Sequence, residues 1–218
     1  MKAVIFDMDG VIIDSEPIHF QVDIEVLQSV GSDVGKSVLE KYVGMTNPEM
    51  WSDIIKTYNI NESIDNIIDL QINRKIDIIK NLDINPIDGI RELLINLKKE
   101  NIPIAIASSS PILFIEAVLA KFEIQDYFKI ILSGEEVLKG KPAPDIYLET
   151  ARLLSLNPSD CLVIEDSKNG VIAAKVAGMK CIGFQNPNSG DQDLSKADFV
   201  VNSIDQIQKE KNEFTSFC

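Results

Sequence analysis

Histidine and cysteine are scarce in this chain of 218 residues, which contains one histidine and three cysteines. With His19 as its single histidine, the chain cannot form a multi-histidine metal centre, and a serine–histidine–aspartate triad has only this residue to draw on. The cysteines have no C-x-x-C spacing, and their odd number is typical of free thiols in a reducing compartment. They are Cys161, Cys181 and Cys218.

Basic residues are fewer than acidic ones, and long hydrophobic runs are absent. The chain has 21 basic against 34 acidic residues, a net charge of −13, which repels nucleic acid and anionic membranes. No hydrophobic run could span a bilayer, and the N-terminus does not resemble a signal peptide. We expect a cytoplasmic protein that binds neither nucleic acid nor membrane. No heptad repeat or long apolar surface calls for a partner subunit, which favours a monomer.

The hydrophobic pattern divides the chain into two parts. Residues 2–6 form an apolar run typical of a buried strand, whereas residues 15–85 have helical periodicity and no convincing strand. From residue 86 onward, expected helices alternate with near-continuous apolar strands, as in a parallel sheet covered on both faces. We therefore predict an α/β fold with a Rossmann-like core domain (residues 1–14 and 86–218) and an inserted helical bundle (residues 15–85).

The expected elements can be stated by residue number. Helices are expected within the insertion at residues 18–30, 37–43, 48–58 and 64–82. Beyond it, strands are expected at residues 102–107, 129–132, 161–164, 180–184 and 199–201. The intervening helices are expected at residues 87–99, 111–122, 145–156, 170–177 and 204–211.

Polar residues follow four of the expected strands. Asp7 and Asp9 follow the first, Ser108, Ser109 and Ser110 the second, Lys141 lies in the loop after the third, and Glu165 and Asp166 follow the fourth. Because ligands bind at the carboxyl edge of a parallel sheet, these residues predict one site. Taken alone, the DMDG segment could be a simple Asx-turn, and Asp166 could cap the next helix.

The residue types at this edge fit phosphoryl transfer. Clustered carboxylates can hold Mg²⁺, and backbone N–H groups of Ser109 and Ser110 at a helix N-terminus can bind an anion. Ser108 adds a hydroxyl donor and Lys141 a positive charge, both suited to phosphate oxygens. Which of the three serines matters most stays open.

Four segments, FDMDGVIIDSEP, IAIASSS, GKPAPDIY and VIEDSKNG, resemble in order and spacing the four motifs of the haloacid dehalogenase-like superfamily of phosphohydrolases. DSEP-x-H, KPAPD and EDS-x-x-G further resemble the branch of β-phosphoglucomutase and related sugar-phosphate phosphatases. The resemblance covers nearly the whole chain and implies that the inserted bundle is a cap domain.

The resemblance implies a role for each matching residue. Asp7 would be the nucleophile that forms an aspartyl-phosphate, and Asp9 the general acid and then the base. Ser108 and Lys141 would hold the phosphoryl oxygens. Mg²⁺ would be the cofactor, bound by the Asp7 side chain, the Asp9 backbone carbonyl and Asp166, with Glu165 ligating directly or through water.

In the cap, the DSEPIH segment makes Glu16 and His19 candidates to face the substrate. Residues 43–49 resemble the specificity loop of the family. The mutase has an arginine near the position of Asn47 that grips the second phosphate of the sugar, and this chain has asparagine there instead. Without that arginine a bisphosphate is held less well, which favours a phosphatase over a mutase. Lys75 could replace the arginine, but it is more simply a solvated residue.

The sequence thus predicts a Mg²⁺-dependent phosphatase that acts on a small phosphorylated metabolite, with sugar phosphates as the expected class. A phosphohexomutase with an altered phosphate clamp is the main alternative. A non-catalytic binding module is disfavoured because it would not need the nucleophile, and a dehalogenase because those relatives do not need the Asp9–Gly10 and Mg²⁺ arrangement.

Overall fold

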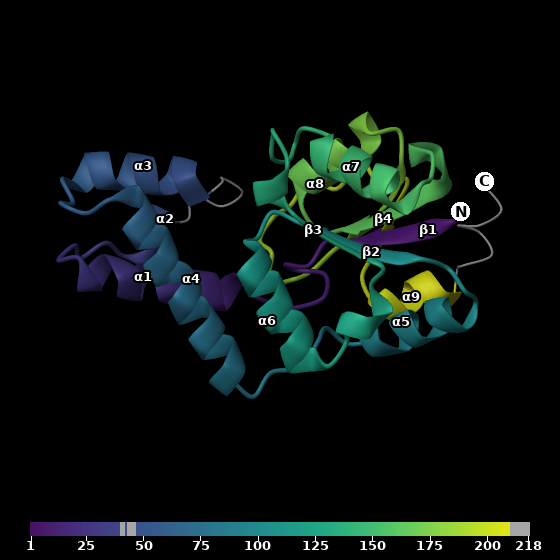
Figure 1. Cartoon of the computed structure of the whole chain (residues 1–218), viewed down its shortest axis with the longest axis horizontal. Coiled ribbons are helices and arrows are strands. Elements are labelled where there is room, and N and C mark those ends of the chain that lie inside the picture. Colours follow the sequence, from purple (N-terminus) through teal and green to yellow (C-terminus); the bar gives the residue numbers. More distant parts are fainter. Residues whose placement is uncertain (40–41, 43–46, 210–218) are drawn as a thin grey trace. The chain divides into compact units, whose positions relative to one another are not determined.

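The chain forms two compact units in the computed structural model, which describes residues 1–39, 42 and 47–209 (Figure 1). The core unit consists of Met1–Asp14 and Ile84–Cys218, and the cap unit of Ser15–Asp83. The cap unit is therefore one continuous insertion into the core unit, directly after the loop that carries the first two acids.

A six-stranded parallel sheet in the order β3-β2-β1-β4-β5-β6 forms the centre of the core unit. Its strands are β1 (Ala3–Phe6), β2 (Ile104–Ser108), β3 (Ile130–Ser133), β4 (Cys161–Glu165), β5 (Lys180–Phe184) and β6 (Phe199–Val201). Every residue of β1, β2 and β4 is buried, as expected for strands covered on both faces. The predicted α/β fold with a Rossmann-like parallel sheet is confirmed.

Helices cover both faces of this sheet. In Figure 1, α5, α6 and α9 lie below the sheet and α7 and α8 above it. Their bounds are α5 (Ile90–Lys99), α6 (Ile112–Phe122), α7 (Asp145–Leu154), α8 (Lys168–Val176) and α9 (Ile204–Lys209). Short 3₁₀ turns, which the hydrophobic pattern does not predict, are η2 (Gln125–Tyr127), η3 (Gly134–Glu136) and η4 (Pro158–Asp160).

The chain order reverses between β1 and β4. Successive strands run from β1 through β2 to β3 on one side, and from β4 through β5 to β6 on the other. Crossover helices on opposite faces leave a crevice at such a switch point, beyond the carboxyl ends of the strands. Asp7 directly follows β1 and Glu165 ends β4, so both lie at this point.

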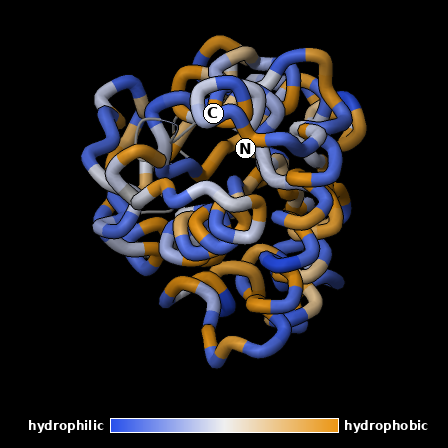
Figure 2. Tube along the Cα trace, turned by 90° about the vertical axis from the view of Figure 1, so that its left-hand side faces the viewer, coloured by the Kyte–Doolittle hydropathy of each residue, from blue (hydrophilic) through white to orange (hydrophobic). Residues whose placement is uncertain are grey.

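The cap unit is built from helices in the described part of residues 15–83. They are α1 (Glu16–Ser29), α2 (Lys36–Leu39), α3 (Asn47–Tyr58) and α4 (Ile64–Asn81). The long helix α4 packs against both α1 and α3, and Trp51, Ile54 and Ile67 are fully buried. Hydrophobic and hydrophilic residues alternate within single helical turns (Figure 2), the pattern of amphipathic helices around a core. Residues 43–46 of the expected specificity loop lie outside the described residues.

Cys161 and Cys181 are buried free thiols, and Cys218 lies outside the described residues. Burial raises the pKa of Cys161 to about 11, so this thiol is protonated and unreactive at neutral pH.

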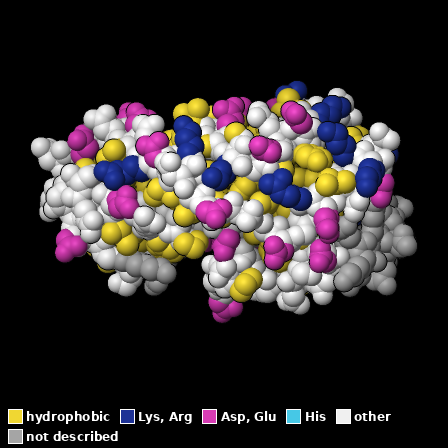
Figure 3. All heavy atoms as spheres, turned by 90° about the horizontal axis from the view of Figure 1, so that it is seen from below, with side chains coloured by type: hydrophobic (Ala, Val, Ile, Leu, Met, Phe, Trp, Pro, Cys, Tyr) yellow, Lys and Arg dark blue, Asp and Glu magenta, His cyan; other side chains and the backbone are white. Residues whose placement is uncertain are grey.

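Within residues 1–39, 42 and 47–209, the structure has no helix both long and apolar enough to cross a bilayer. Acidic and basic side chains lie scattered among hydrophobic atoms on the face in Figure 3. Among the described residues, that face shows no continuous patch of basic side chains.

Candidate active site

The loop after β1 brings Asp7 and Gly10 against β4 and the segment that follows it. The Asp7 backbone N–H donates to the Ile164 carbonyl at 3.0 Å, which extends the β1–β4 pairing up to the acid. Gly10 has a φ of +74°, and a Cβ at this position would lie 1.9 Å from Oδ2 of Asp166. Only glycine therefore permits both the turn and the close approach of Asp166.

Lys141 joins the carboxyl ends of three strands. Its Nζ lies 2.6 Å from Oδ1 of Asp7 and 2.7 Å from Oε1 of Glu165, and donates to the Ala107 carbonyl at 3.1 Å. The Lys141 side chain is only 7% exposed, and its amine makes close contacts with both carboxylates. Asp7 and Lys141, which are 134 residues apart in sequence, thus form one buried ion pair, as the strand-end pattern predicted for their placement.

Glu165 is fully buried, and both its carboxylate oxygens are occupied. Oε1 accepts from Lys141 and from the Tyr147 hydroxyl at 2.9 Å, and Oε2 accepts from the backbone N–H and the hydroxyl of Ser167, both at 2.9 Å. A Cβ on Gly170 would lie 1.5 Å from Oε1 of Glu165, so α8 leaves space for this carboxylate by having no side chain there.

Asp166 is not the cap of the helix that follows it. Ser167 is the N-cap of α8, and its hydroxyl accepts from the Gly170 N–H at 3.0 Å. Asp166 is 6% exposed, and its Oδ2 accepts a hydrogen bond from the Ser189 hydroxyl. The loop after β5 that carries Ser189 also contacts the first acidic loop, because the Asn186 amide donates to the Gly10 carbonyl at 2.9 Å.

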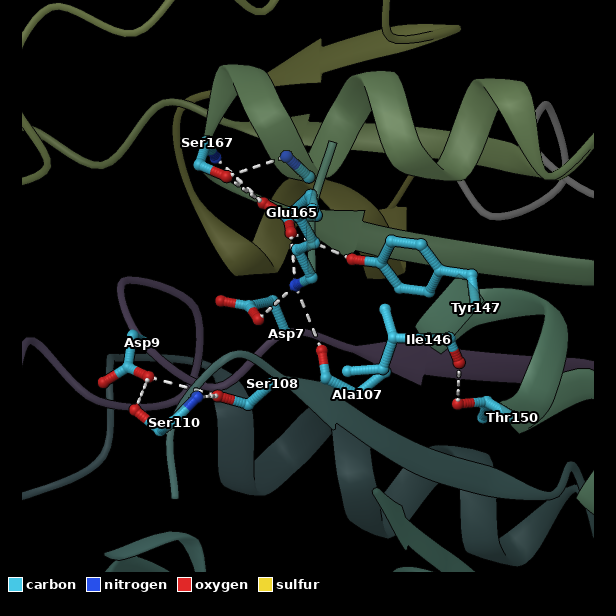
Figure 4. A network of polar contacts seen from close by, with 12 residues as sticks. Asp7, Asp9, Ala107, Ser108, Ser110, Ile146, Tyr147, Thr150, Glu165 and Ser167 are labelled. Atoms are coloured by element: carbon cyan, nitrogen blue, oxygen red, sulfur yellow. Dashed lines mark hydrogen bonds and ion pairs between the residues drawn. The ribbon is translucent and has the colours of Figure 1, made fainter. Parts of the chain in front are cut away.

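The three serines after β2 differ in their contacts. The hydroxyls of Ser108 and Ser110 donate to Oδ2 of Asp9 at 3.2 and 2.7 Å, whereas Ser109 is exposed. The Ser110 N–H, expected to bind an anion, donates to the Ser108 hydroxyl at 3.0 Å instead. Ser108 and Ser110 therefore hold the Asp9 carboxylate in this structure (Figure 4).

The start of α6 is also engaged by protein groups. Its first backbone N–H, from Ile112, donates to Oε2 of Glu135 at 3.2 Å. Glu135 belongs to the 3₁₀ turn η3, which begins at Gly134. Gly134 lets η3 lie against Ser109, because a Cβ on Gly134 would be 3.1 Å from the Ser109 Cα. These contacts reduce the number of N–H groups at this helix end that could bind an anion.

The buried charges at this site are unbalanced. Burial, with a smaller contribution from the neighbouring acids, raises the pKa of Asp7 to about 8 in spite of Lys141. Burial and the charges of Glu165 and Asp7 raise the pKa of Asp166 well above its usual value. Burial alone would lower the pKa of Lys141, but the two carboxylates that flank its amine outweigh burial and raise it. The single ammonium group of Lys141 therefore does not offset the effect of burial on Asp7 and Asp166.

This donor set fits a hard divalent cation. One ligand atom from each of Asp7, Glu165 and Asp166 can be chosen so that all lie within 4.8 Å of one another. Buried oxygen ligands with an excess of negative charge suit Mg²⁺, which uses few protein carboxylates and keeps part of its water shell. Because four donors fill the acceptor positions of Glu165, Asp7 and Asp166 have more capacity to ligate a metal.

The raised pKa of Asp7 predicts a pH-dependent effect on stability. Between its ordinary value of 3.8 and its raised value of about 8, the folded protein retains a proton that the unfolded chain has lost. This group therefore makes the free energy of unfolding fall as pH rises through that interval. In EDTA, urea denaturation should show Asp7→Asn gaining stability relative to the wild type as pH rises from about 4 to about 8. If the stability of Asp7→Asn relative to the wild type stays constant or falls as pH rises, the pKa of Asp7 is not raised in the folded protein.

The cap candidates lie on two helices of the cap unit. Glu16 and His19 are half-buried on α1, in its first turn and just after it. Asn47 is the first residue of α3, and its amide donates to Oε1 of Gln71 at 2.8 Å. Gln71 is fully buried and donates in turn to Asp23, so the Asn47 side chain belongs to a polar chain within the cap unit.

Lys75 was expected to be solvated, and this prediction was wrong. Lys75 is 5% exposed. It lies one helical turn after the fully buried Gln71, on the face of α4 that is turned into the cap unit. The hydrophobic spacing of α4 did not reveal the burial of Lys75, because Lys75 and Gln71 are polar residues at buried positions of this helix.

The comparisons with known proteins agree with this geometry. A family model described as haloacid dehalogenase-like hydrolase matches residues 4–184. Hexitol phosphatase B of Escherichia coli (strain K12) is 32% identical over 211 residues, covering 94% of this chain and 93% of the relative. β-Phosphoglucomutase of Bacillus subtilis (strain 168) is 33% identical over 220 residues, covering 96% of this chain and 93% of the relative.

A solved structure extends the similarity to the fold. The crystal structure of β-phosphoglucomutase from Clostridium difficile has a TM-score of 0.83 and 30% identity, covering 99% of both chains. The resemblance predicted from the four motifs is confirmed. The chain is a phosphohydrolase that belongs to the haloacid dehalogenase-like hydrolases, in the branch of β-phosphoglucomutase.

Proposed function

We propose that this protein is a Mg²⁺-dependent phosphatase that hydrolyses small phosphomonoesters, with sugar phosphates as the substrate class, through an aspartyl-phosphate intermediate. The observation that carries the proposal is the buried arrangement of Asp7, Lys141 and Asp166 at the switch point of the sheet. The relatives named hexitol phosphatase and β-phosphoglucomutase support phosphorylated carbohydrates as the class.

In this proposal, Asp7 and Asp9 divide the chemistry between them. A carboxylate oxygen of Asp7 forms a bond to phosphorus while the bond from phosphorus to the ester oxygen breaks. Asp9 gives its proton to the departing oxygen, so the alcohol leaves neutral. Asp9 then takes a proton from a water molecule that attacks the aspartyl-phosphate, and inorganic phosphate leaves while both acids regain their starting states.

Other residues of the core unit support these steps. Lys141 would neutralise charge on the phosphoryl oxygens, and its contact with Asp7 supports this role. Ser108 and Ser110 orient the Asp9 carboxylate through their hydroxyls. Exposed Ser109 could contact the phosphate from the solvent side.

Mg²⁺ would be held by the side chains of Asp7 and Asp166 and by the backbone carbonyl of Asp9. When bound, it supplies positive charge for the nucleophile and the phosphoryl oxygens. Glu165 would support this site through Lys141 or through a water molecule. We also propose that residues 15–85 form a cap domain, and that Glu16 and His19 are candidates to contact the substrate.

β-Phosphoglucomutase activity is the alternative, and Asn47 is the observation that separates the two. A mutase must grip a second phosphate, for which a bidentate guanidinium is well suited. Asn47 carries no charge, and its amide nitrogen already donates to Gln71. This arrangement favours a substrate with one phosphate and hydroxyl groups.

Phosphate release from a panel of sugar phosphates and sugar-alcohol phosphates tests the proposal. With Mg²⁺ we expect turnover of about 1–10³ s⁻¹ on the best substrate, the usual enzyme range. Excess EDTA should abolish release and added Mg²⁺ should restore it, because the site holds more acid than base. Asp126→Asn, at an exposed acid on η2, is a control that should leave release unchanged.

Two outcomes would overturn the proposal. Isomerisation of β-glucose 1-phosphate in the presence of a bisphosphate primer, without phosphate release, would assign the mutase activity. Release that persists unchanged after metal removal would contradict the metal-dependent mechanism.

A further inference from the structure

A tyrosine that none of the predicted roles uses lies in the centre of the site. Tyr147 is on α7, two residues into the helix, and its side chain is fully buried. Its hydroxyl donates to Oε1 of Glu165 at 2.9 Å (Figure 4), and its ring centre lies 5.0 Å from the Lys141 amine. A buried phenol aimed at a carboxylate contributes a directed hydrogen bond in addition to its packing.

Glu165 joins this tyrosine to the lysine. Oε1 of Glu165 accepts from both Tyr147 and Lys141, and Oε2 accepts twice from Ser167. Four donors fix both the position and the rotation of the carboxylate, which has about four lone-pair sites. Removing the Tyr147 donor would leave one lone pair of a buried carboxylate unsatisfied, and the carboxylate could then rotate about the Ser167 contacts.

Lys141 depends on Glu165 for its own position. Besides Asp7, the amine has two fixed partners, Glu165 and the Ala107 carbonyl. When Asp7 reacts with phosphorus its charge is lost, so these two partners would have to hold the amine toward the phosphoryl group. Its position then depends on the orientation of Glu165.

We propose that Tyr147 is a positioning residue for catalysis, because its hydroxyl fixes Glu165 and thereby holds Lys141 in place for phosphoryl transfer. This inference rests on the proposed phosphatase function. The proposal gives a role to α7, the helix directly after the loop that carries Lys141. Lys141 and Tyr147 are six residues apart in sequence, and both donate to Oε1 of Glu165.

The test is Tyr147→Phe, which keeps the ring and removes only the hydroxyl. We expect kcat to fall about tenfold with KM changed less than about twofold, since lost outer contacts typically cost 10–100-fold and act on the transition state. Affinity for inorganic phosphate in the presence of Mg²⁺, measured by calorimetry, should also stay within about twofold, because the lost positioning acts on the transition state and not on ground-state binding. The Mg²⁺ concentration for half-maximal binding should not change.

Thr150→Val is the matched control. Thr150 is also fully buried on α7, one turn after Tyr147, but its hydroxyl donates to the Ile146 carbonyl of its own helix at 2.7 Å. This variant removes a buried hydroxyl from the same helix without touching the site, so we expect kcat within about twofold of the wild type. Thermal unfolding of both variants shows whether either change acts through stability.

The possible results separate this inference from the function on which it rests. A wild type without phosphatase activity would overturn the proposed function. An active wild type with an unchanged Tyr147→Phe variant, or equal losses of kcat in Tyr147→Phe and Thr150→Val, would overturn the positioning role alone. A Tyr147→Phe variant that loses Mg²⁺ affinity while keeping kcat at saturating metal would assign Tyr147 to the metal site instead.

Discussion

Replacing Asp7 with asparagine is expected to lower phosphate release by about 10⁴-fold or more, the size of effect typical of losing a catalytic nucleophile. An amide oxygen is a poor nucleophile, and it cannot form the aspartyl-phosphate. The measurement is kcat on the best substrate of the panel, with protein freed of wild-type contamination.

The same substitution should make the protein more stable at neutral pH. Asp7→Asn removes one acid from a site in which burial and neighbouring acids disfavour its charge, and it leaves the Lys141–Glu165 ion pair in place. Sites that carry unbalanced buried charge for function commonly gain stability when that charge is removed. Retained activity together with lowered stability would show that Asp7 has a structural role and not a catalytic one.

Gly170→Ala is expected to damage both stability and activity. Alanine in a helix interior normally stabilises by about 1 kcal/mol relative to glycine. Here the new Cβ would lie 1.5 Å from Oε1 of Glu165, so the carboxylate or α8 must move. We expect the free energy of unfolding to fall by about 3 kcal/mol, the upper range for overpacking. We expect kcat to fall about 10²-fold, because Lys141 is displaced together with Glu165.

Gly35→Ala is the control for this prediction. Gly35 and its two chain neighbours aside, no heavy atom of the described residues lies within 4 Å of a Cβ placed at Gly35. Its φ is outside the left-handed region, so the substitution should change neither stability nor activity measurably. The pair is compared by urea denaturation and by phosphate release. A Gly170→Ala protein with wild-type stability would mean that Glu165 has another rotamer available to it without cost.

The fold could be predicted largely from local patterns. The strands of a parallel sheet are buried on both faces, so β1, β2 and β4 are near-continuous apolar runs that stand out in the sequence. Helix ends were less accurate: α5 begins at Ile90, not at residue 87, after Gly89 with a φ of +88°. The short 3₁₀ turns were missed because three residues are too few to show periodicity.

The centre of the site could also be predicted, because the ends of parallel strands meet at one edge. That rule places Asp7, Lys141 and Glu165 together, and the structure has them within hydrogen-bonding distance. The catalytic and metal-binding roles of these residues stay predictions. The engagement of the Ser110 N–H by Ser108 could not be foreseen, because it depends on one side-chain rotamer.

The supporting residues could not be found from the sequence. Tyr147, Asn186 and Ser189 reach the site through packing between elements, at 18, 176 and 23 residues from their partners. Tyr147 occupies a hydrophobic position on α7, where an aromatic residue is ordinarily part of the core. The polar loop after β5 gave a weak signal, since Asn186 and Ser189 are also common turn residues.

The central position of β1 has a consequence for the order in which the chain can fold during synthesis. Its residue Val4 pairs with Ile104 of β2 and its residue Ala3 with Cys161 of β4, so β1 waits for its first partner strand while the ribosome adds about 100 residues. At about 5–20 residues per second this takes roughly 5–20 s. The cap unit, whose contacts fall within residues 15–83, emerges complete during that interval. The nascent chain therefore carries an unpaired hydrophobic strand beside a finished helical bundle, and a chaperone that shields short apolar segments would act on β1 during this time.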